Sequence, residues 1–248
     1  MPVFSVVMPA WRCAGYLGEA LRSALEQTLT DLEIIVILDP CEDGTREILL
    51  AEAARDVRIV PVQNASHKGL AESRNIGIQK ARGEFVAFLD ADDLWLPDKL
   101  EKQLAAFRTT GVALCCTSYS FVDKESSPLK KSYIIEGPVD FSLLLRENVI
   151  GTSTCAVQCA VAQAYRMDSS YFHEDYVYWL SILRSGTEGI ALHEPLARYR
   201  VLPDSRSRDK FNTARHRWIV YRRFLRFGIM RSLYYFSCYV VRAVRKYR

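Results

Sequence analysis

The amino-acid sequence predicts an α/β fold: a twisted, mostly parallel, Rossmann-like sheet with helices on both faces. Apolar runs with the length of buried strands recur along the first half of the chain, and segments with helical spacing separate them. This alternation is typical of βαβ units, whose strands run parallel. The chain has 248 residues, 49% of them hydrophobic and 25% charged, which is enough for one such domain and a tail.

The first strand is the run FSVVMPA, residues 4–10, which is apolar almost throughout and therefore typical of a strand buried on both faces. A helix over 14–28 follows, where leucines recur at helical spacing. LEIIVILD, residues 32–39, is the second buried strand. The further elements of the first half are predicted as a helix over 45–54, a strand over 57–62, a helix over 69–81, a strand over 84–93, a helix over 96–108 and a strand over 112–122.

The second half has a less regular pattern. Residues 123–140 are polar and predict a loop or hairpin, and 189–201 predict a strand pair or an extended segment. Between them we predict a helix over 141–148, a strand running into a helix over 152–165, and an amphipathic helix over 172–186 that Gly186 ends. Because no internal repeat or low-complexity linker is present, we expect one compact domain over 1–209, with halves at 1–110 and 111–209, and an appendage over 210–248.

Cysteine usage and the chain start favour a protein of a reducing compartment. The seven Cys include no CxxC pair and only four His accompany them, so we expect buried thiols and neither a disulfide nor a zinc framework. The start, MPVFSVVMPA, lacks the basic and long apolar regions of a signal peptide and is predicted to be a strand. The longest late apolar run, LYYFSCYVV, has nine residues, well short of the roughly 18 that a membrane span needs.

The end of the chain is strongly basic. From residue 210 onward there are nine Arg, two Lys and no acidic residue, so this tail carries +11 and the rest of the chain −7. Aromatic and aliphatic residues lie between the arginines, and we expect a pair of amphipathic helices on the inner surface of the cell membrane. The alternative is that these aromatic residues pack back on the domain. No nucleic-acid-binding module is recognisable in the tail, so we expect no nucleic-acid partner.

Three carboxylates lie close together at the end of a predicted strand, in the segment FLDADDLWLP over 88–97. Asp90 and Asp92 are spaced as alternate ligands, which suits a hard divalent cation that also binds phosphate and water. The alternative is that Asp93 caps the following helix and the others are solvated. Asp39 ends another strand, and ligands of parallel sheets bind beyond the carboxyl ends of the strands. The sequence therefore favours a metal and phosphate site at this edge.

Four stretches together resemble the family 2 glycosyltransferases, a group of inverting enzymes with the GT-A fold. They are SVVMPAW (5–11), LEIIVILDPCEDGT (32–45), GLAESRNIGIQKARGEFVAFLDADDLWLPDKL (69–100) and HEDYVYWLSILRSG (173–186), within roughly the first 200 residues. Within the family the chain is most similar to bacterial enzymes of cell-surface polysaccharide assembly, of O-antigen, capsule or teichuronic type, partly through YRVLPDSRSRDK (199–210).

The resemblance implies a nucleotide-sugar site at the strand ends. Asp39 would accept a hydrogen bond from the imide of a uracil, and Arg74 would approach the nucleotide or its phosphates. Asp92 would bind Mn²⁺ or Mg²⁺, with Asp90 beside the metal or the ribose and Asp93 behind them. The remaining residues that would border the nucleotide sugar are Pro9, Ala10 and Ala91.

The segment HEDYVYW carries the catalytic base in this family, and Asp175 is the position that matches. Inversion needs one carboxylate that takes the proton from the acceptor hydroxyl as it attacks the anomeric carbon. Glu174 is the alternative base, although acidic residues at a helix start also stabilise the helix dipole. We expect Asp175 to be the base.

Two positions depart from the family pattern. Leu38 stands where many members have the first of two aspartates, and Leu202 stands where many have a metal-binding histidine after a YR pair. His173 and His193 could replace that histidine, but each is expected to be an ordinary packed or surface side chain.

The resemblance implies inverting transfer of a sugar from a nucleotide-diphosphate donor, with UDP as the expected nucleotide, to a hydroxyl of a lipid-linked glycan. A polyprenyl diphosphate at the cytoplasmic face of a bacterial membrane is the expected carrier. Two other functions stay open: a non-catalytic nucleotide-sugar-binding scaffold, which Leu38 and Leu202 favour, and a nucleotidyltransferase. The latter predicts an early glycine-rich phosphate loop, for which AWRCAGYLG is a poor match.

Overall fold

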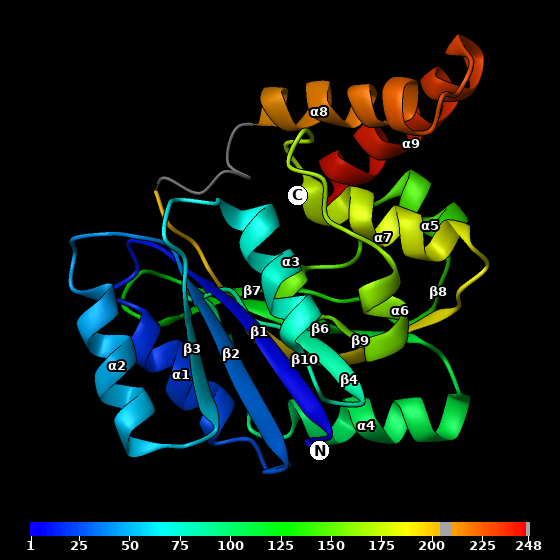
Figure 1. Ribbon diagram of the computed structural model, residues 1–248. Helices are drawn as coiled ribbons and strands as arrows, with labels where there is room; N and C mark the ends of the chain where they lie inside the picture. Colours follow the sequence, from blue (N-terminus) through cyan, green and yellow to red (C-terminus); the bar gives the residue numbers. More distant parts are fainter. Residues whose placement is uncertain (204–209, 247–248) are drawn as a thin grey trace.

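The computed structural model describes residues 1–203 and 210–246, which form one mixed sheet with helices on both faces (Figure 1). The strands are β1 (Phe4–Ala10), β2 (Leu32–Leu38), β3 (Ile59–Gln63), β4 (Phe85–Phe88), β5 (Leu94–Trp95), β6 (Leu114–Val122), β7 (Pro128–Tyr133), β8 (Gly137–Val139), β9 (Ala156–Gln158) and β10 (Gly189–Arg200). The helices are α1 (Leu17–Leu25), α2 (Thr45–Arg55), α3 (Leu70–Lys80), α4 (Lys99–Thr110), α5 (Phe141–Arg146), α6 (Cys159–Ala164), α7 (Glu174–Arg184), α8 (Lys210–Ile219) and α9 (Ile229–Lys246), with a 3₁₀ turn η1 (Thr152–Thr154) and a π-helical turn η3 (Val220–Phe224).

The strand order is β3-β2-β1-β4-β9-β6-β10-β5, with β7 added to β6 and β8 to β10. The first four strands run parallel, as the βαβ pattern predicts. In the second half β9 enters antiparallel between β4 and β6, and β6 pairs in parallel with β10. The α/β prediction is therefore confirmed, and the mixed part of the sheet comes from the less regular half of the sequence.

Two apolar layers cover the sheet because successive side chains of a buried strand point to opposite faces. Val7 and Ile35 pack with α3 and α7 on one face, whereas Val6 and Ile34 pack with α1 and α4 on the other. All seven residues of β2 are buried, as its continuous apolar run predicts.

Helix α3 approaches the sheet very closely at one glycine. A Cβ atom on Gly77 would lie 2.5 Å from Cγ1 of Val7, so only glycine fits between this helix and β1. This contact sets the packing distance between α3 and the sheet.

Several predicted boundaries differ from the observed ones. The strand predicted over 84–93 ends at Phe88, because the chain leaves the sheet before the three carboxylates and then adds the short strand β5. The helix predicted from 96 begins at Lys99. The segment over 189–201 is a single long strand with a register shift near Pro195, and 123–140 contains the returning strand β7. Gly186 has φ 88° just after α7 ends, as expected of a helix-terminating glycine.

The tail contains two helices that pack on α5 and α7 (Figure 1). Tyr221 is fully buried and donates a hydrogen bond to the carbonyl of Leu145 (2.7 Å), and the guanidinium of Arg217 lies 3.6 Å from the ring centre of Tyr176. The inner face of the tail thus packs back on the domain. The outer face of α9 exposes large apolar side chains, namely Ile229, Met230, Leu233, Tyr234, Val240 and Val241. In the described part of the chain, no helix is both long and apolar enough to cross a membrane.

A buried lysine makes the stability of this fold depend on pH. Lys99 is fully buried; its ammonium donates to Gln103 (2.7 Å) and lies 4.0 Å from the ring centre of Trp95. Burial lowers the pKa of Lys99 to about 7 from its usual 10.5. Between these values the unfolded chain binds the extra proton and the folded one does not, so the free energy of unfolding rises with pH.

We predict that Lys99→Met removes this dependence, since methionine keeps the length and the contact with Trp95. Urea denaturation from pH 7 to pH 10 should give a wild-type free energy of unfolding that rises relative to the variant by up to about 1.4 kcal/mol per pH unit. Parallel pH profiles for the two proteins would contradict the prediction.

Candidate active site

The residues singled out in the sequence meet at one edge of the sheet. Pro9 and Ala10 end β1, Asp39 follows β2, and Asp90 follows β4 after one residue. These three strands are neighbours in the order β2-β1-β4, so their carboxyl ends lie together. The main-chain N–H of Asp39 donates to the carbonyl of Ala10 (3.0 Å), which joins two of these ends directly.

The acidic segment forms a tight turn that Ser153 holds. The N–H of Asp93 donates to the carbonyl of Asp90 (3.0 Å), and the N–H of Asp90 donates to the hydroxyl of Ser153 (3.1 Å). The same hydroxyl donates to the carboxylate of Asp93 at 2.5 Å. Asp93 is 3% exposed, and helix α4 begins six residues later, so this aspartate fixes the turn and does not cap the helix. Ala91 is buried inside the turn.

The surroundings of Asp92 disfavour its negative charge. Burial and the neighbouring charge of Asp90 raise the pKa of Asp92 to about 6. Burial and the charges of Asp92 and Asp90 also raise the pKa of Asp93 well above its usual range. A divalent cation would relieve this repulsion, and oxygen ligands are the type that Mn²⁺ and Mg²⁺ accept. Among residues 1–203 and 210–246 no three His, Cys, Asp or Glu side chains form a metal-binding group, so a cation at Asp92 would need ligands from substrate and water.

Arg74 lies between two carboxylates inside the protein. It is 2% exposed; Nη2 donates to Asp90 (2.6 Å) and Nη1 donates to Glu174 (3.0 Å). These contacts join α3, the acidic turn and the start of α7, and the approach of Arg74 to the nucleotide or its phosphates, which the resemblance implies, stays a prediction. The Nε atom of Arg74 is buried and makes no hydrogen bond within the described part of the chain.

The two acidic residues at the start of α7 have different surroundings. Glu174 is 4% exposed and bound to Arg74, whereas Asp175 is partly exposed. Thr152 donates to Oδ2 of Asp175 (3.1 Å), and the N–H of Tyr176 donates to its Oδ1 (2.7 Å). The geometry therefore leaves Asp175 the more accessible carboxylate of the pair.

The turn η1 connects the acidic turn with α7, because Ser153 bonds Asp90 and Asp93 while its neighbour Thr152 bonds Asp175. Neither residue belongs to the motifs that the sequence pattern predicts for the site. The hydroxyl-rich GTSTC segment before an apolar strand is the signal that could have suggested them.

Asp39 is 2% exposed and organises the loop after β3. It accepts hydrogen bonds from the side chain of Asn64 (2.8 Å) and from the main-chain N–H groups of Lys68 (3.0 Å) and Gly69 (2.8 Å). His67 also lies 3.1 Å from the carboxylate. Asp39 thus holds one wall of the neighbouring cavity.

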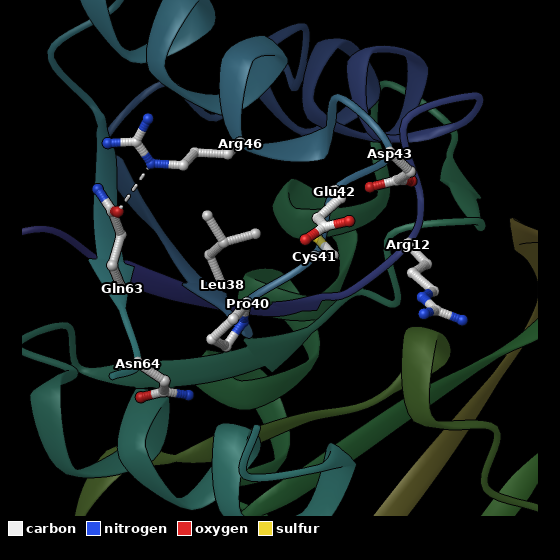
Figure 2. A pocket seen from close by; sticks show the side chains of 9 residues that line it. All are labelled: Arg12, Leu38, Pro40, Cys41, Glu42, Asp43, Arg46, Gln63 and Asn64. Atoms are coloured by element: carbon white, nitrogen blue, oxygen red, sulfur yellow. Dashed lines mark hydrogen bonds between the residues drawn. The ribbon is translucent and has the colours of Figure 1, made fainter. Parts of the chain in front are cut away.

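A cavity of about 730 Å³ opens beside these strand ends, and Figure 2 shows the side chains around it. Pockets of this size are typical of small-molecule sites. Leu38, where the family often has aspartate, lies in the wall of the cavity. The lining residues are Arg12, Leu38, Pro40, Cys41, Glu42, Asp43, Arg46, Gln63 and Asn64.

The two histidines that could replace the missing metal ligand lie in ordinary places. His193 is exposed, and its Nδ1 lies 3.2 Å from the carboxylate of Glu136. The ring of His173, just before α7, packs against Phe172 with centroids 4.8 Å apart. Leu202 follows β10 and is partly exposed, and residues 204–209 of the YRVLPDSRSRDK stretch lie outside the described residues.

Residues 5–170 match the model of the glycosyl transferase family 2. The chain belongs to this family. TuaG of Bacillus subtilis, named as a teichuronic acid biosynthesis glycosyltransferase, is 33% identical over 245 residues, covering 99% of this chain and 97% of that protein. WfgD of Escherichia coli, a UDP-Glc:alpha-D-GlcNAc-diphosphoundecaprenol beta-1,3-glucosyltransferase, is 28% identical over 245 residues, covering 98% and 94%.

Solved structures of glycosyltransferases share this fold. TarS of S. aureus in complex with UDP-GlcNAc matches with a TM-score of 0.72 at 18% identity, covering 90% of this chain and 67% of that one. The mannosyltransferase PcManGT of Pyrobaculum calidifontis, in complex with GDP-Man and Mn²⁺, matches with a TM-score of 0.72 at 17% identity, covering 98% and 73%. These matches confirm the GT-A fold that the resemblance implies. The family match and the relatives together show that the chain is a glycosyltransferase.

Arg200 supports the acidic turn from behind, a contact that the sequence did not reveal. It is 1% exposed; its main-chain N–H donates to Asp93 (2.9 Å) and its Nε donates to the carbonyl of Asp92 (2.7 Å). Nη1 donates to the hydroxyl of Ser126 (2.8 Å), and Nη2 pairs with Glu19 (2.8 Å). The acidic turn is thereby tied to α1 and to the loop after β6.

We predict that Arg200→Met lowers the free energy of unfolding by about 3 kcal/mol, because the carbonyl of Asp92, the hydroxyl of Ser126 and the carboxylate of Glu19 lose the buried guanidinium that joins them. Arg198→Met, two residues away on the same strand and partly exposed, is the matched control and should change it by less than about 0.5 kcal/mol. Chemical denaturation measures both, and equal losses in the two variants would refute the role of Arg200.

Proposed function

We propose that the protein transfers a sugar with inversion from a UDP-linked donor to a hydroxyl of a lipid-linked glycan. The observation that carries this proposal is the turn η1, whose Thr152 bonds Asp175 while Ser153 bonds the acidic turn at Asp90 and Asp93. The proposed base and the proposed site for a diphosphate would thus lie close together, as single displacement at an anomeric carbon requires.

The donor and acceptor classes follow from the relatives. WfgD is named for UDP-Glc and for a diphosphoundecaprenol-linked acceptor, and TuaG is named for teichuronic acid biosynthesis. The cavity of about 730 Å³ beside Asp39 would take the nucleoside. Its wall of charged and amide side chains supports a polar base such as uracil.

Asp92, with Asp90 beside it, would hold Mn²⁺ or Mg²⁺, which when bound supplies positive charge for a leaving diphosphate. Burial and then the charge of Asp90 raise the pKa of Asp92, and a bound cation would favour the charged form of this carboxylate.

Asp175 would remove the proton of the acceptor hydroxyl. The hydrogen bond from Thr152 holds one oxygen of this carboxylate, and its partial exposure lets a substrate reach it. Glu174 would instead keep the start of α7 in place through Arg74.

We predict that Asp175→Asn lowers kcat by about a thousandfold, because the attacking hydroxyl then keeps its proton. Asp92→Ala should abolish the dependence of the rate on Mn²⁺ or Mg²⁺. Asp31→Asn, an exposed carboxylate before β2 at the opposite edge of the sheet, should leave the rate unchanged. The assay is transfer from a panel of nucleotide sugars to membrane lipid extract, with and without metal.

Loss of sugar transfer in both site variants but not in the control would support three points together: the glycosyltransferase activity, the UDP-linked donor and Asp175 as the base. Binding of UDP-sugars without turnover under any condition would refute the proposal and favour the scaffold function, with Leu202 as the first position to test.

The tail would hold the enzyme on the inner face of the cell membrane, as a peripheral protein. The exposed apolar residues of α9 recur along one side of an 18-residue helix that contains no acidic side chain. Arginines of the tail would meet anionic headgroups while this apolar side enters the acyl boundary.

We predict that the protein sediments with vesicles of anionic phosphatidylglycerol and that Leu233→Glu weakens this binding about tenfold or more, since a buried carboxylate opposes insertion. Val57→Glu, at an apolar residue 95% exposed before β3, is the control and should bind as the wild type does. Equal binding by all three proteins would contradict a membrane role for α9.

A further inference from the structure

Four aromatic rings form a partly exposed cluster on one face of the second half of the sheet; we name it the aromatic platform. It consists of Tyr119 and Phe121 on β6, Tyr133 on β7 and Tyr199 on β10. Tyr119 pairs in register with Tyr133, and Phe121 with Tyr199. The ring centroids of Tyr119 lie 5.3 Å from those of Phe121 and Tyr133 and 6.2 Å from that of Tyr199.

The platform adjoins both parts of the candidate active site. A Cβ atom on Gly151 would lie 3.7 Å from the ring of Tyr119, and the next residue, Thr152, donates to Asp175. Tyr199 is followed by Arg200, whose N–H donates to Asp93 in the acidic turn. The rings are therefore one residue away from the contacts that hold the base and the carboxylates.

The sheet order separates the platform from the donor cavity. The cavity lies at the ends of β2 and β3, the acidic turn follows β4, and the platform lies on β6, β7 and β10 on the other side of β4. A molecule on the platform would thus meet a donor sugar across the acidic turn. Inversion requires that the acceptor attack from the side opposite to the leaving diphosphate.

We propose that the aromatic platform binds the terminal pyranose ring of the acceptor glycan. Sugar rings have apolar C–H faces that pack on aromatic side chains, and pockets for polar ligands combine such faces with a few oriented polar groups. This assignment rests on the proposed function, because it names the acceptor subsite of the same reaction.

A second observation connects the platform with the tail. The hydroxyl of Tyr133 donates to Glu147 (2.6 Å), and the other oxygen of Glu147 pairs with Arg242 on α9 (2.7 Å). The helix with the exposed apolar side is therefore bonded, through one carboxylate, to a ring of the platform. This suits an acceptor whose sugar is attached to a lipid.

A second cavity, of about 410 Å³, is the competing place for an acceptor. Phe172 and His216 line it with ring centroids 4.6 Å apart, and its acidic residue is Glu174. The carboxylate of this cavity, Glu174, is neutralised by Arg74. The platform instead adjoins Asp175, the more accessible carboxylate of the pair.

The test compares Tyr199→Ala, Phe121→Ala, Tyr199→Phe and Phe172→Ala in the full chain, with a short-chain lipid diphosphate carrying N-acetylglucosamine as the acceptor probe. We expect both platform alanine variants to raise the KM for this probe about tenfold or more, which corresponds to the loss of a ring contact. Tyr199→Phe keeps the ring and should stay within about twofold of the wild type, as should Phe172→Ala. The Kd for UDP in Mn²⁺, measured by calorimetry, should be the same for all five proteins.

Acceptor binding is also measured directly, by ligand-observed NMR with the probe and no donor, so that the platform can be tested even if no transfer occurs. Weakened probe binding in the two platform alanine variants supports the platform in either case. A wild type that binds the probe but never transfers sugar would refute the proposed function alone. Loss of probe binding in Phe172→Ala and not in Tyr199→Ala, or equal binding by every variant, would overturn the platform.

Discussion

The candidate site depends on one buried arginine. Arg74 joins three segments that are far apart in the sequence: its own helix α3, the acidic turn at Asp90, and the start of α7 at Glu174. A guanidinium in the interior is stable only with carboxylates around it, and each carboxylate in turn needs the guanidinium. Because removal of Arg74 would take the cation from both carboxylates at once, this one side chain holds the three segments together.

The remaining polar contacts extend this arrangement outward. Ser153 and Arg200 bond the acidic turn from two sides, and Thr152 orients Asp175. Two buried arginines, Arg74 and Arg200, lie against these carboxylates, yet burial and the charge of Asp90 still raise the pKa of Asp92. Three aspartates at the end of a strand would suit the cation that we propose for this turn.

The succession of the first four strands and their helices along the chain could be predicted from the sequence. Each of these elements depends on the apolar spacing of its own residues, which can be seen without knowing the contacts between distant segments. The acidic turn could also be placed at the sheet edge, because Asp39 and Asp90 follow strands whose carboxyl ends must meet. The role of Arg74 could not be predicted: its partner Glu174 is 100 residues away, and an SRN segment gives no sign of burial. The contacts of Ser153 depend on the antiparallel insertion of β9, which the βαβ pattern does not contain.

The tail shows why a family boundary and a structural boundary can differ. The match to the family ends at residue 170, before Asp175, whereas buried residues of the tail such as Tyr221 and Arg217 cover α7, the helix that begins with that carboxylate. A protein shortened to the matched region would lose α7 altogether, and one shortened to residue 209 would keep it with an uncovered apolar surface. Protein engineers who wish to transplant this site into another scaffold should therefore move the chain through η3 as one unit.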